Sequence, residues 1–258
     1  MDIKDKVIVV TGGANGIGRA LCERFHADGA KGICVVDMDE ESGKAVAQAV
    51  GGLFVRCDVS KRADIDAVVD QTVQRFGPID LFCSNAGIGT ASEGAFGMDA
   101  SAEQWQRIWD INVMAHVHAA QAVLPSMVER GSGYLLQTSS AAGLLSQIGS
   151  ATYSTTKHAA IGLAESLAIA YGDSGIKVSV LCPQGVRTAM TAGQGDTPQA
   201  GDGMLDPSEV ADAVVDALAK ESFLVLPHPE VLTYMQRKAG DYDRWIGGMQ
   251  RFRRKFVD

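Results

Sequence analysis

Three polar side chains in the middle of the chain have the types and spacing of a proton-transfer site. Tyr153 and Lys157 lie four residues apart, and the apolar residues after them repeat at helical spacing. On a helix, positions i and i+4 share a face, so the phenol and the ammonium would lie side by side. A neighbouring cation favours the phenolate, so we expect Lys157 to lower the pKa of Tyr153 from roughly 10 toward neutrality. The hydroxyl of Ser140 could then hold a substrate oxygen against the phenol.

A tyrosine and a lysine at this spacing are often an ordinary surface pair, so the interpretation depends on the rest of the chain. The short apolar run 7–10 leads into the glycine-rich segment 11–18, after which Ala20, Leu21 and Phe25 repeat at helical spacing. A strand, a glycine turn and a helix form the context that a phosphate-binding loop requires. Glycines let the backbone approach a pyrophosphate, and the helix N-terminus offers free N–H groups. We therefore expect a dinucleotide-binding loop here.

An acidic residue ends the next apolar run, 32–37. Asp37 lies roughly 20 residues beyond the glycines, where a dinucleotide fold places the carboxylate that binds the adenosine ribose. That carboxylate would repel a 2′-phosphate by about 4 kcal/mol at about 4 Å, before solvent screening. Neither 13–15 nor 38–39 contains a Lys or Arg that could receive such a phosphate. We therefore predict NAD rather than NADP, whereas Asp39 could merely cap the following helix.

Strand-like and helix-like segments alternate along the whole chain. The predicted strands are 7–10, 32–37, 53–57, 79–83, 134–138, 177–182 and 223–226, and helical patterns separate them. Such alternation predicts an α/β fold, with a doubly wound, mostly parallel, Rossmann-type sheet and helices on both faces. Ligands of this fold bind at the carboxyl ends of the strands, where Gly12, Asp37, Asp58 and Asn85 fall. We find no linker, so residues 1–258 are interpreted as a single domain.

The C-terminal third contains two segments outside the strand pattern. Residues 189–206 are polar, glycine-rich and without periodicity, and their position after a predicted strand favours a lid over the active site. Residues 207–220 form a capped helical pattern, and the amphipathic, aromatic-rich tail 229–258 is interpreted as core or subunit contact. The basic residues at 251–255 are interpreted as a solvated helix end.

Composition excludes several classes of protein. The 258 residues carry a formal net charge of −8, which argues against nucleic acid as a partner. The five cysteines share no C-x-x-C spacing, so we expect neither disulfides nor a metal site. No apolar run has membrane-spanning length and no signal peptide is recognisable, so a cytoplasmic location is expected.

Taken together, these residues resemble the single-domain branch of the short-chain dehydrogenase/reductase family from Lys6 to about Lys220. The matching motifs are Thr11-Gly12-x-x-x-Gly16-x-Gly18, Asp58-Val59, Asn85-Ala86-Gly87, Asn112, Ser140 and Tyr153-x-x-x-Lys157. The resemblance implies a catalytic tetrad of Asn112, Ser140, Tyr153 and Lys157, in which Asn112 would hold a water for proton relay. It also implies the cofactor-binding residues Gly12, Asn15, Gly16, Ile17, Gly18, Asp37, Met38, Asp58, Val59, Asn85, Ala86, Gly87, Tyr153, Lys157, Pro183, Val186 and Thr188. Among these, Asp58 and Val59 would hold the adenine and Thr188 would meet the nicotinamide carboxamide.

The sequence departs from the family pattern in two places. Pro183-Gln184-Gly185 replaces the usual Pro-Gly, so the backbone beside the nicotinamide could differ and Gln184 could point toward the substrate. The chain also lacks the glycine-rich turn that often supports a tetramer. A homo-oligomer, either tetramer or dimer, is still expected.

The substrate is predicted only as a class. The apolar residues Ala141, Ala142, Leu144, Leu145 and Ile148, with Met190, suggest an apolar pocket wall. An apolar secondary alcohol or ketone is therefore expected. Two alternatives remain open, namely an NADPH-dependent carbonyl reductase and a non-catalytic NAD-binding sensor.

Overall fold

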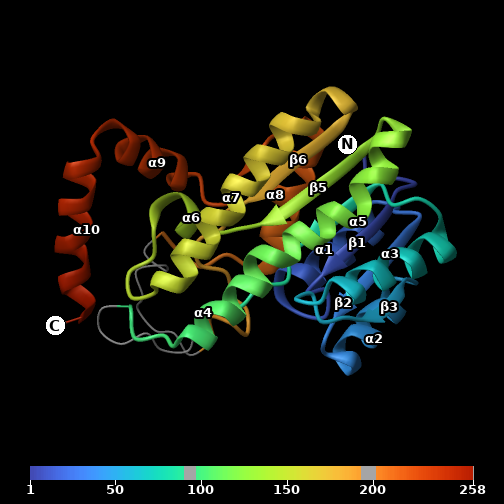
Figure 1. Ribbon diagram of the computed structural model, residues 1–258, viewed down its shortest axis with the longest axis horizontal. Coiled ribbons are helices and arrows are strands. Elements are labelled where there is room, and N and C mark those ends of the chain that lie inside the picture. The colour runs from blue at the N-terminus through green and yellow to red at the C-terminus, as the bar shows by residue number, and fades with distance from the viewer. Residues whose placement is uncertain (90–96, 193–201, 258) are drawn as a thin grey trace.

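The computed structural model describes residues 1–89, 97–192 and 202–257. Seven strands form one sheet in the order β3-β2-β1-β4-β5-β6-β7, and all neighbouring strands are parallel (Figure 1). The strands are β1 (Val7–Thr11), β2 (Gly32–Asp37), β3 (Leu53–Arg56), β4 (Leu81–Ser84), β5 (Gly133–Thr138), β6 (Ile176–Leu181) and β7 (Leu224–Val225). The chain builds outward from β1 to β3 and then returns to β4 on the other side of β1. The predicted doubly wound parallel sheet is confirmed, with its topological switch point between β1 and β4.

Helices cover both faces of the sheet (Figure 1). The helices are α1 (Gly16–Ala27), α2 (Glu40–Ala49), α3 (Arg62–Phe76), α4 (Ala102–Trp109), α5 (Ala115–Arg130), α6 (Ala141–Leu145), α7 (Ala151–Tyr171), α8 (Pro207–Lys220), α9 (Glu230–Gly240) and α10 (Tyr242–Val257). A π-helical turn, η1 (Asp110–Met114), joins α4 to α5, and a 3-10 turn, η2 (Gly172–Ser174), follows α7.

Strand alternation explains the two layers. In β1, Val7 and Val9 join the apolar cluster beneath α3, α5 and α7, whereas Ile8 and Val10 join the cluster beneath α1, α2 and α8. Successive side chains of a strand point to opposite faces, so a strand between two helical layers must be apolar at every position. All of β1 is accordingly buried, and the sheet holds its carboxyl-end loops on a rigid base.

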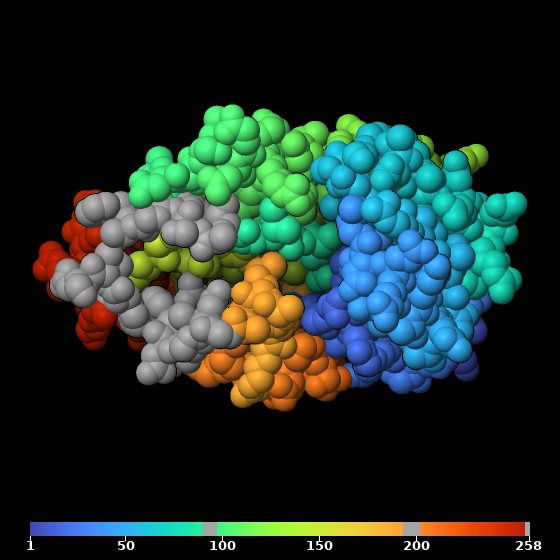
Figure 2. All heavy atoms as spheres, turned by 90° about the horizontal axis from the view of Figure 1, so that it is seen from below, coloured from blue at the N-terminus to red at the C-terminus, as the bar shows by residue number. Residues whose placement is uncertain are grey.

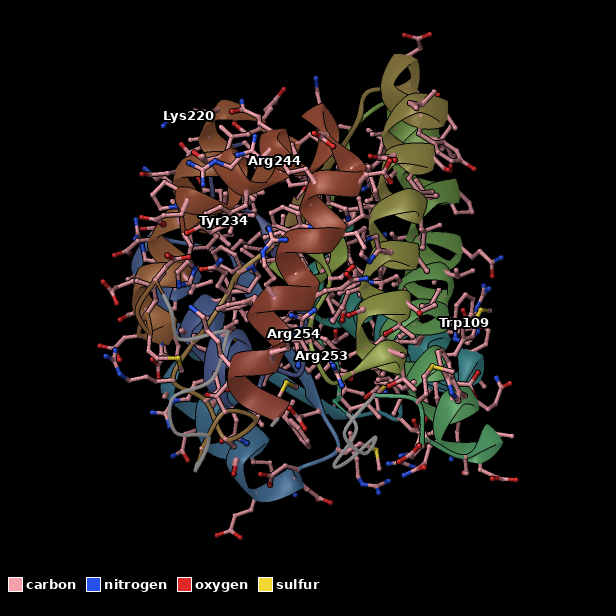
Figure 3. The ribbon with its side chains drawn as sticks, turned by 90° about the vertical axis from the view of Figure 1, so that its left-hand side faces the viewer. Trp109, Lys220, Tyr234, Arg244, Arg253 and Arg254 are labelled. Carbon is pink, nitrogen blue, oxygen red and sulfur yellow. The ribbon has the colours of Figure 1, made fainter. Side chains whose placement is uncertain are left out.

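The C-terminal tail forms two helices rather than an extended arm. Val231 of α9, together with the neighbouring Trp245, packs against Ala141 and Leu145 of α6. Farther along, α10 extends away from the sheet at one end of the molecule (Figure 1). Its arginines, including Arg244, Arg253 and Arg254, are seen along this helix in Figure 3. Part of the tail is therefore core, as predicted, whereas its predicted role in subunit contact stays a prediction.

Several general predictions can be compared with the described residues. All five cysteines are buried free thiols. Among the described residues, no helix combines the length and the apolar composition that crossing a bilayer would require. Much of the predicted lid, at residues 193–201, lies outside the described part of the chain, so its role stays a prediction.

Candidate active site

Helix α7 presents the tyrosine and the lysine on one face, as their spacing predicts. Lys157 is 3% exposed, and its Nζ lies 5.4 Å from the centre of the Tyr153 ring. The same Nζ donates a hydrogen bond to the Thr138 carbonyl oxygen at 3.1 Å. Because Thr138 is the last residue of β5, this bond ties the lysine to the carboxyl end of the sheet. Lys157 is therefore a fixed buried cation beside the phenol, and not a surface lysine.

Burial dominates the acid–base properties of this pair. Burial raises the pKa of Tyr153 above its usual value, while a hydrogen bond with the Ser140 side chain acts in the opposite direction. Burial also lowers the pKa of Lys157 from 10.5 to about 8. Both shifts favour the neutral form of the group. The pKa of Tyr153 is therefore raised, and not lowered toward neutrality as predicted: loss of water around the phenol is the largest effect, and the effect that opposes it is the Ser140 hydrogen bond rather than the charge of Lys157.

Ser140 stands where β5 gives way to α6. Its Oγ accepts the N–H of Ala142 at 3.1 Å as the N-cap of α6, and it donates to the Pro183 carbonyl at 3.3 Å. The neighbouring Ser139 donates to the carbonyl oxygen of Lys157 at 2.8 Å and thereby braces α7. The structure thus brings Ser140, and not Ser139, to the phenol of Tyr153.

Asn112 lies in the π-helical turn between α4 and α5. Its Oδ1 accepts the N–H of Ile88 at 2.9 Å, and its Nδ2 donates to the Ile88 carbonyl at 2.9 Å and to Thr156 Oγ1 at 3.3 Å. A β-carbon added at Gly87 would lie 3.2 Å from Asn112 Oδ1 and 3.3 Å from Lys157 Nζ. Asn112 and Lys157 therefore approach the same point beside Gly87, and the joint action of the four residues as a catalytic tetrad stays a prediction. The side-chain amide of Asn112 is occupied by its bonds to the backbone of Ile88. A relay water would therefore have to bind a backbone atom of Asn112.

The glycine loop between β1 and α1 approaches its neighbours too closely for a side chain. Gly12 and Gly16 have φ values of +66° and +53°, which favour glycine. A β-carbon on Gly18 would lie 2.0 Å from the Gly12 carbonyl oxygen. Asn15 precedes α1 without capping it through its side chain. No side-chain cap from Asn15 therefore occupies the first N–H groups of α1, and their predicted binding of a pyrophosphate stays a prediction.

Asp37 lies directly beside this loop. Its Oδ2 accepts the N–H of Ala14 at 3.0 Å, and its Oδ1 accepts the N–H of Asp39 at 3.0 Å. Each carboxylate oxygen retains capacity for another hydrogen bond, so ribose hydroxyls fit this position. Asp39 instead caps α2 by accepting the N–H of Ser42, which is the role that the sequence left open. Met38 is half exposed next to them.

At the ends of β3 and β4, the residues predicted to hold the cofactor make hydrogen bonds within the protein or are buried, and their contact with a cofactor stays a prediction. Asp58 accepts hydrogen bonds from Ser60, which lower its pKa, and Val59 is buried. The Asn85 amide is bound internally, because Nδ2 donates to the Thr11 carbonyl at 3.1 Å and Oδ1 accepts from Thr138 at 3.1 Å. Asn85 therefore fixes three strand ends relative to one another.

The segment after β6 lies opposite the glycine loop. Pro183 and Val186 are buried, and a β-carbon on Gly16 would lie 3.1 Å from Thr188 Cγ2. A cavity of about 680 Å³ opens between the two segments, with Asn15, Gly16 and Thr188 among its lining residues. None of the proposed tetrad lines it. Figure 2 shows a hollow on this face among the blue, green and orange segments.

Several of the residues expected to form an apolar pocket wall pack in the core, and their contact with a substrate stays a prediction. Ala141 and Leu145 pack against Val231 of α9, so these side chains serve the core. Leu144 is also in contact with that cluster. Met190 is 48% exposed after β6 and stays a candidate for substrate contact.

Sequence reasoning assigned no role to several residues that hold the site together, although Thr11 stood within the glycine-loop motif. Thr11 Oγ1 accepts the N–H groups of Asn85 and Ala86 at 2.9 and 3.1 Å, and Thr138 and Thr156 bind Lys157 and Asn112 as described. Each of these threonines ends a strand or stands next to a motif residue, which is the signal that could have identified it. Within the described residues, no group of acidic, Cys and His side chains could hold a metal ion.

A doubly wound parallel sheet with a glycine loop at its switch point defines a dinucleotide-binding α/β protein. The sequence matches the short chain dehydrogenase family over residues 6–199. The chain therefore belongs to this family of oxidoreductases, as its motifs indicated.

Similar proteins cover most of the chain. A 2,5-dichloro-2,5-cyclohexadiene-1,4-diol dehydrogenase of Sphingobium indicum is 39% identical over 73% of this chain and 76% of that protein. A 1-deoxy-11-beta-hydroxypentalenate dehydrogenase of Streptomyces avermitilis is 32% identical over an alignment that covers 95% of this chain and 93% of that protein. A short-chain dehydrogenase/reductase of Burkholderia phymatum, crystallised with NAD, superposes with a TM-score of 0.85 at 27% identity and covers 94% of this chain and 96% of its own.

Proposed function

We propose that this protein is an NAD-dependent dehydrogenase that interconverts an apolar secondary alcohol and its ketone. The observation that carries the proposal is the Tyr153 phenol, which bonds to Ser140 and lies beside the buried Lys157. A hydroxyl, a phenol and an ammonium around one point can hold and protonate an oxygen atom.

Each residue has a distinct part in the proposed mechanism. On substrate binding, the Ser140 hydroxyl would turn its proton from the Pro183 carbonyl to the substrate oxygen and hold that oxygen against Tyr153. In reduction the phenol gives its proton to the forming alkoxide, and in oxidation the phenolate takes the hydroxyl proton. Lys157 supplies positive charge that stabilises the phenolate at the moment of transfer. When bound, NAD(H) supplies the hydride acceptor or donor.

The fit of this chain to NAD is supported by the glycine loop and by Asp37. The three glycines leave a cradle that a β-carbon would fill, and Asp37 bonds to the loop backbone with capacity left for ribose hydroxyls. Asn15, Asp58 and Thr188 would complete the binding surface. The carboxylate at 37 would repel the 2′-phosphate of NADP, so the NADPH-dependent alternative is disfavoured.

The names of the relatives narrow the substrate class. The relatives in Sphingobium and Streptomyces are named as dehydrogenases of a cyclohexadiene diol and a hydroxypentalenate. By extension, a cyclic secondary alcohol is the substrate class that we propose. A panel of cyclic and open-chain secondary alcohols with NAD would test this, and a consistent preference for open-chain alcohols would contradict it.

Replacing Tyr153 tests the chemistry. Tyr153→Phe should lower turnover by about 10²–10⁴-fold, the usual contribution of a general acid, while NADH binding, followed by fluorescence, survives. Tyr171→Phe on the same helix is the matched control and should retain activity. Full turnover by Tyr153→Phe would refute the mechanism. No turnover by the wild type with any alcohol or ketone, despite NADH binding, would favour the sensor alternative.

Replacing Asp37 tests the cofactor. Asp37→Asn removes the charge but retains an oxygen for Ala14, so the preference of kcat/KM for NAD over NADP should fall by about 10- to 1000-fold. Asp39→Asn removes the neighbouring charge at the cap of α2 and should leave the preference largely unchanged. Equal loss of preference in the two variants would contradict the assignment.

A further inference from the structure

His228 is a buried histidine that the sequence motifs do not include. It lies between β7 and α9 and is 3% exposed. Its Nδ1 accepts the backbone N–H of Gln184 at 3.2 Å. Only an unprotonated nitrogen can accept, so this bond requires a neutral ring with its proton on Nε2.

The hydrogen bond reaches the active site through a single peptide unit. The N–H of Gln184 and the carbonyl of Pro183 belong to the same planar peptide group, and they point in opposite directions. On the far side, that carbonyl accepts Ser140 Oγ at 3.3 Å and the N–H of Ala141 at 2.9 Å. The peptide is therefore held between the imidazole and the proposed catalytic serine. A rotation of this plane would change both sets of bonds together.

Among the described residues, the Gln184 N–H makes no hydrogen bond other than the one to His228 Nδ1. His228 Nε2 and Gln184 Oε1 are both buried without a hydrogen-bond partner. The carbonyl groups of Gly185 and Gly203 lie near the ring but do not meet Nε2 in hydrogen-bond geometry. Loss of the His228 Nδ1 acceptor would therefore leave the backbone N–H of Gln184 without a hydrogen-bond acceptor.

We propose that His228 is a positioning residue, which fixes the Pro183–Gln184 peptide and so orients Ser140, and which releases that peptide when its ring becomes protonated. This inference rests on the proposed role of Ser140. Gln184 occupies a position where the family pattern has glycine, which has greater backbone freedom. The hydrogen bond to the His228 imidazole thus restrains the backbone at Gln184, which is where this chain departs from the Pro-Gly pattern of the family.

The charges around the ring determine the direction of the pH effect. The acidic side chains of Glu230 and Asp202 and the two glycine carbonyls favour the imidazolium, but burial outweighs them and lowers the pKa of His228 below 6.5. The neutral ring accordingly persists at neutral pH, and release of the peptide is expected on the acid side of pH 6.5.

Two substitutions separate positioning from packing. In His228→Asn, the amide oxygen can take the place of Nδ1 and does not titrate. In His228→Leu, no acceptor remains. We expect kcat at pH 7.5 to stay within about threefold of wild type for the Asn variant and to fall about tenfold or more for the Leu variant.

The pH profile gives a readout that simple packing would not change. The acid-side loss of kcat below pH 6.5 should be present in wild type, and in a His26→Asn control on the exposed face of α1, but absent in His228→Asn. Nitrogen NMR of the His228 ring should show the Nε2–H tautomer at pH 7.5, independently of any substrate.

Three results would overturn the proposal: an Nδ1–H tautomer, an acid limb that His228→Asn retains, or equal kcat in the Leu variant and wild type. These failures are distinguishable from failure of the proposed function. In the latter case Tyr153→Phe would also retain turnover, or the wild type would have none.

Discussion

The buried charge of Lys157 leads to a quantitative prediction about stability. The side chain is 3% exposed, and its ammonium has one hydrogen bond, to Thr138. Burial lowers its pKa from 10.5 to about 8, which corresponds to about 3 kcal/mol, because each pH unit of pKa change is worth about 1.4 kcal/mol. The folded protein therefore holds this proton less tightly than the unfolded chain does.

The sign of the pH effect follows from that difference. A group with a lowered pKa in the folded state contributes stability that is present above the unfolded pKa and lost as pH falls through the folded pKa. Between pH 8 and 10.5, the unfolded chain binds the proton that the folded protein has released. The free energy of unfolding should consequently rise with pH, by up to about 3 kcal/mol from this residue alone.

Comparison with Lys157→Met isolates the effect, because methionine fills a similar volume without a charge. Urea unfolding of both proteins from pH 7.5 to 10.5 should show wild type gaining up to about 3 kcal/mol over the variant. Burial raises the pKa of thiols such as Cys34 to about 11. Their titration therefore lowers the free energy of unfolding of the protein over this pH range. Thiols that do not interact with Lys157 contribute equally in both proteins and cancel in the difference, whereas Cys182, which interacts electrostatically with Lys157, does not cancel fully. A difference that stays constant with pH would refute the conclusion that the ammonium is buried at a cost.

Two further predictions concern the glycine loop and the residue that precedes it. Gly18→Ala, which places a methyl group 2.0 Å from the Gly12 carbonyl oxygen, should cost about 3 kcal/mol in urea unfolding and abolish NADH binding. Gly162→Ala on α7 meets nothing within 4 Å, so it should be neutral or stabilising by up to about 1 kcal/mol. Thr11→Val removes the acceptor for the Asn85 N–H and should cost about 2–4 kcal/mol in the same assay, since buried donors are left unpaired. Unfolding midpoints equal to wild type for Gly18→Ala or Thr11→Val would contradict these contacts.

Much of the fold could be predicted because apolar runs and helical repeats are local signals. The run 7–10 predicted β1, and 207–220 predicted α8, to within one residue. The strand predicted at 79–83 instead spans Leu81–Ser84. There Asp80 makes backbone and carboxylate bonds to Val7 before the regular ladder begins, and hydrophobicity carries no information about that pairing.

The candidate site was predictable where its residues share one element. Tyr153 and Lys157 lie on a single helix, so their spacing determined their proximity. His228 and Gln184 are 44 residues apart, and no local pattern connects them. Asn112, in the π-helical turn, makes two hydrogen bonds to the backbone of Ile88, which is 24 residues away in the sequence.

The wrong pKa direction for Tyr153 shows what a sequence cannot supply. The spacing of the two residues identified Lys157 as a neighbouring cation. The largest effect on the pKa of each group is instead its burial away from water. Because burial raises the pKa of Tyr153 and lowers that of Lys157, the structure keeps the phenol protonated at neutral pH. A protonated phenol beside Ser140 is already the acid that ketone reduction needs. Alcohol oxidation must first form a phenolate, which the Ser140 hydrogen bond favours by lowering the pKa of Tyr153 and which the charge of Lys157 stabilises in the proposed mechanism. The proposed chemistry in the oxidative direction therefore depends on both residues more strongly than the reductive direction does.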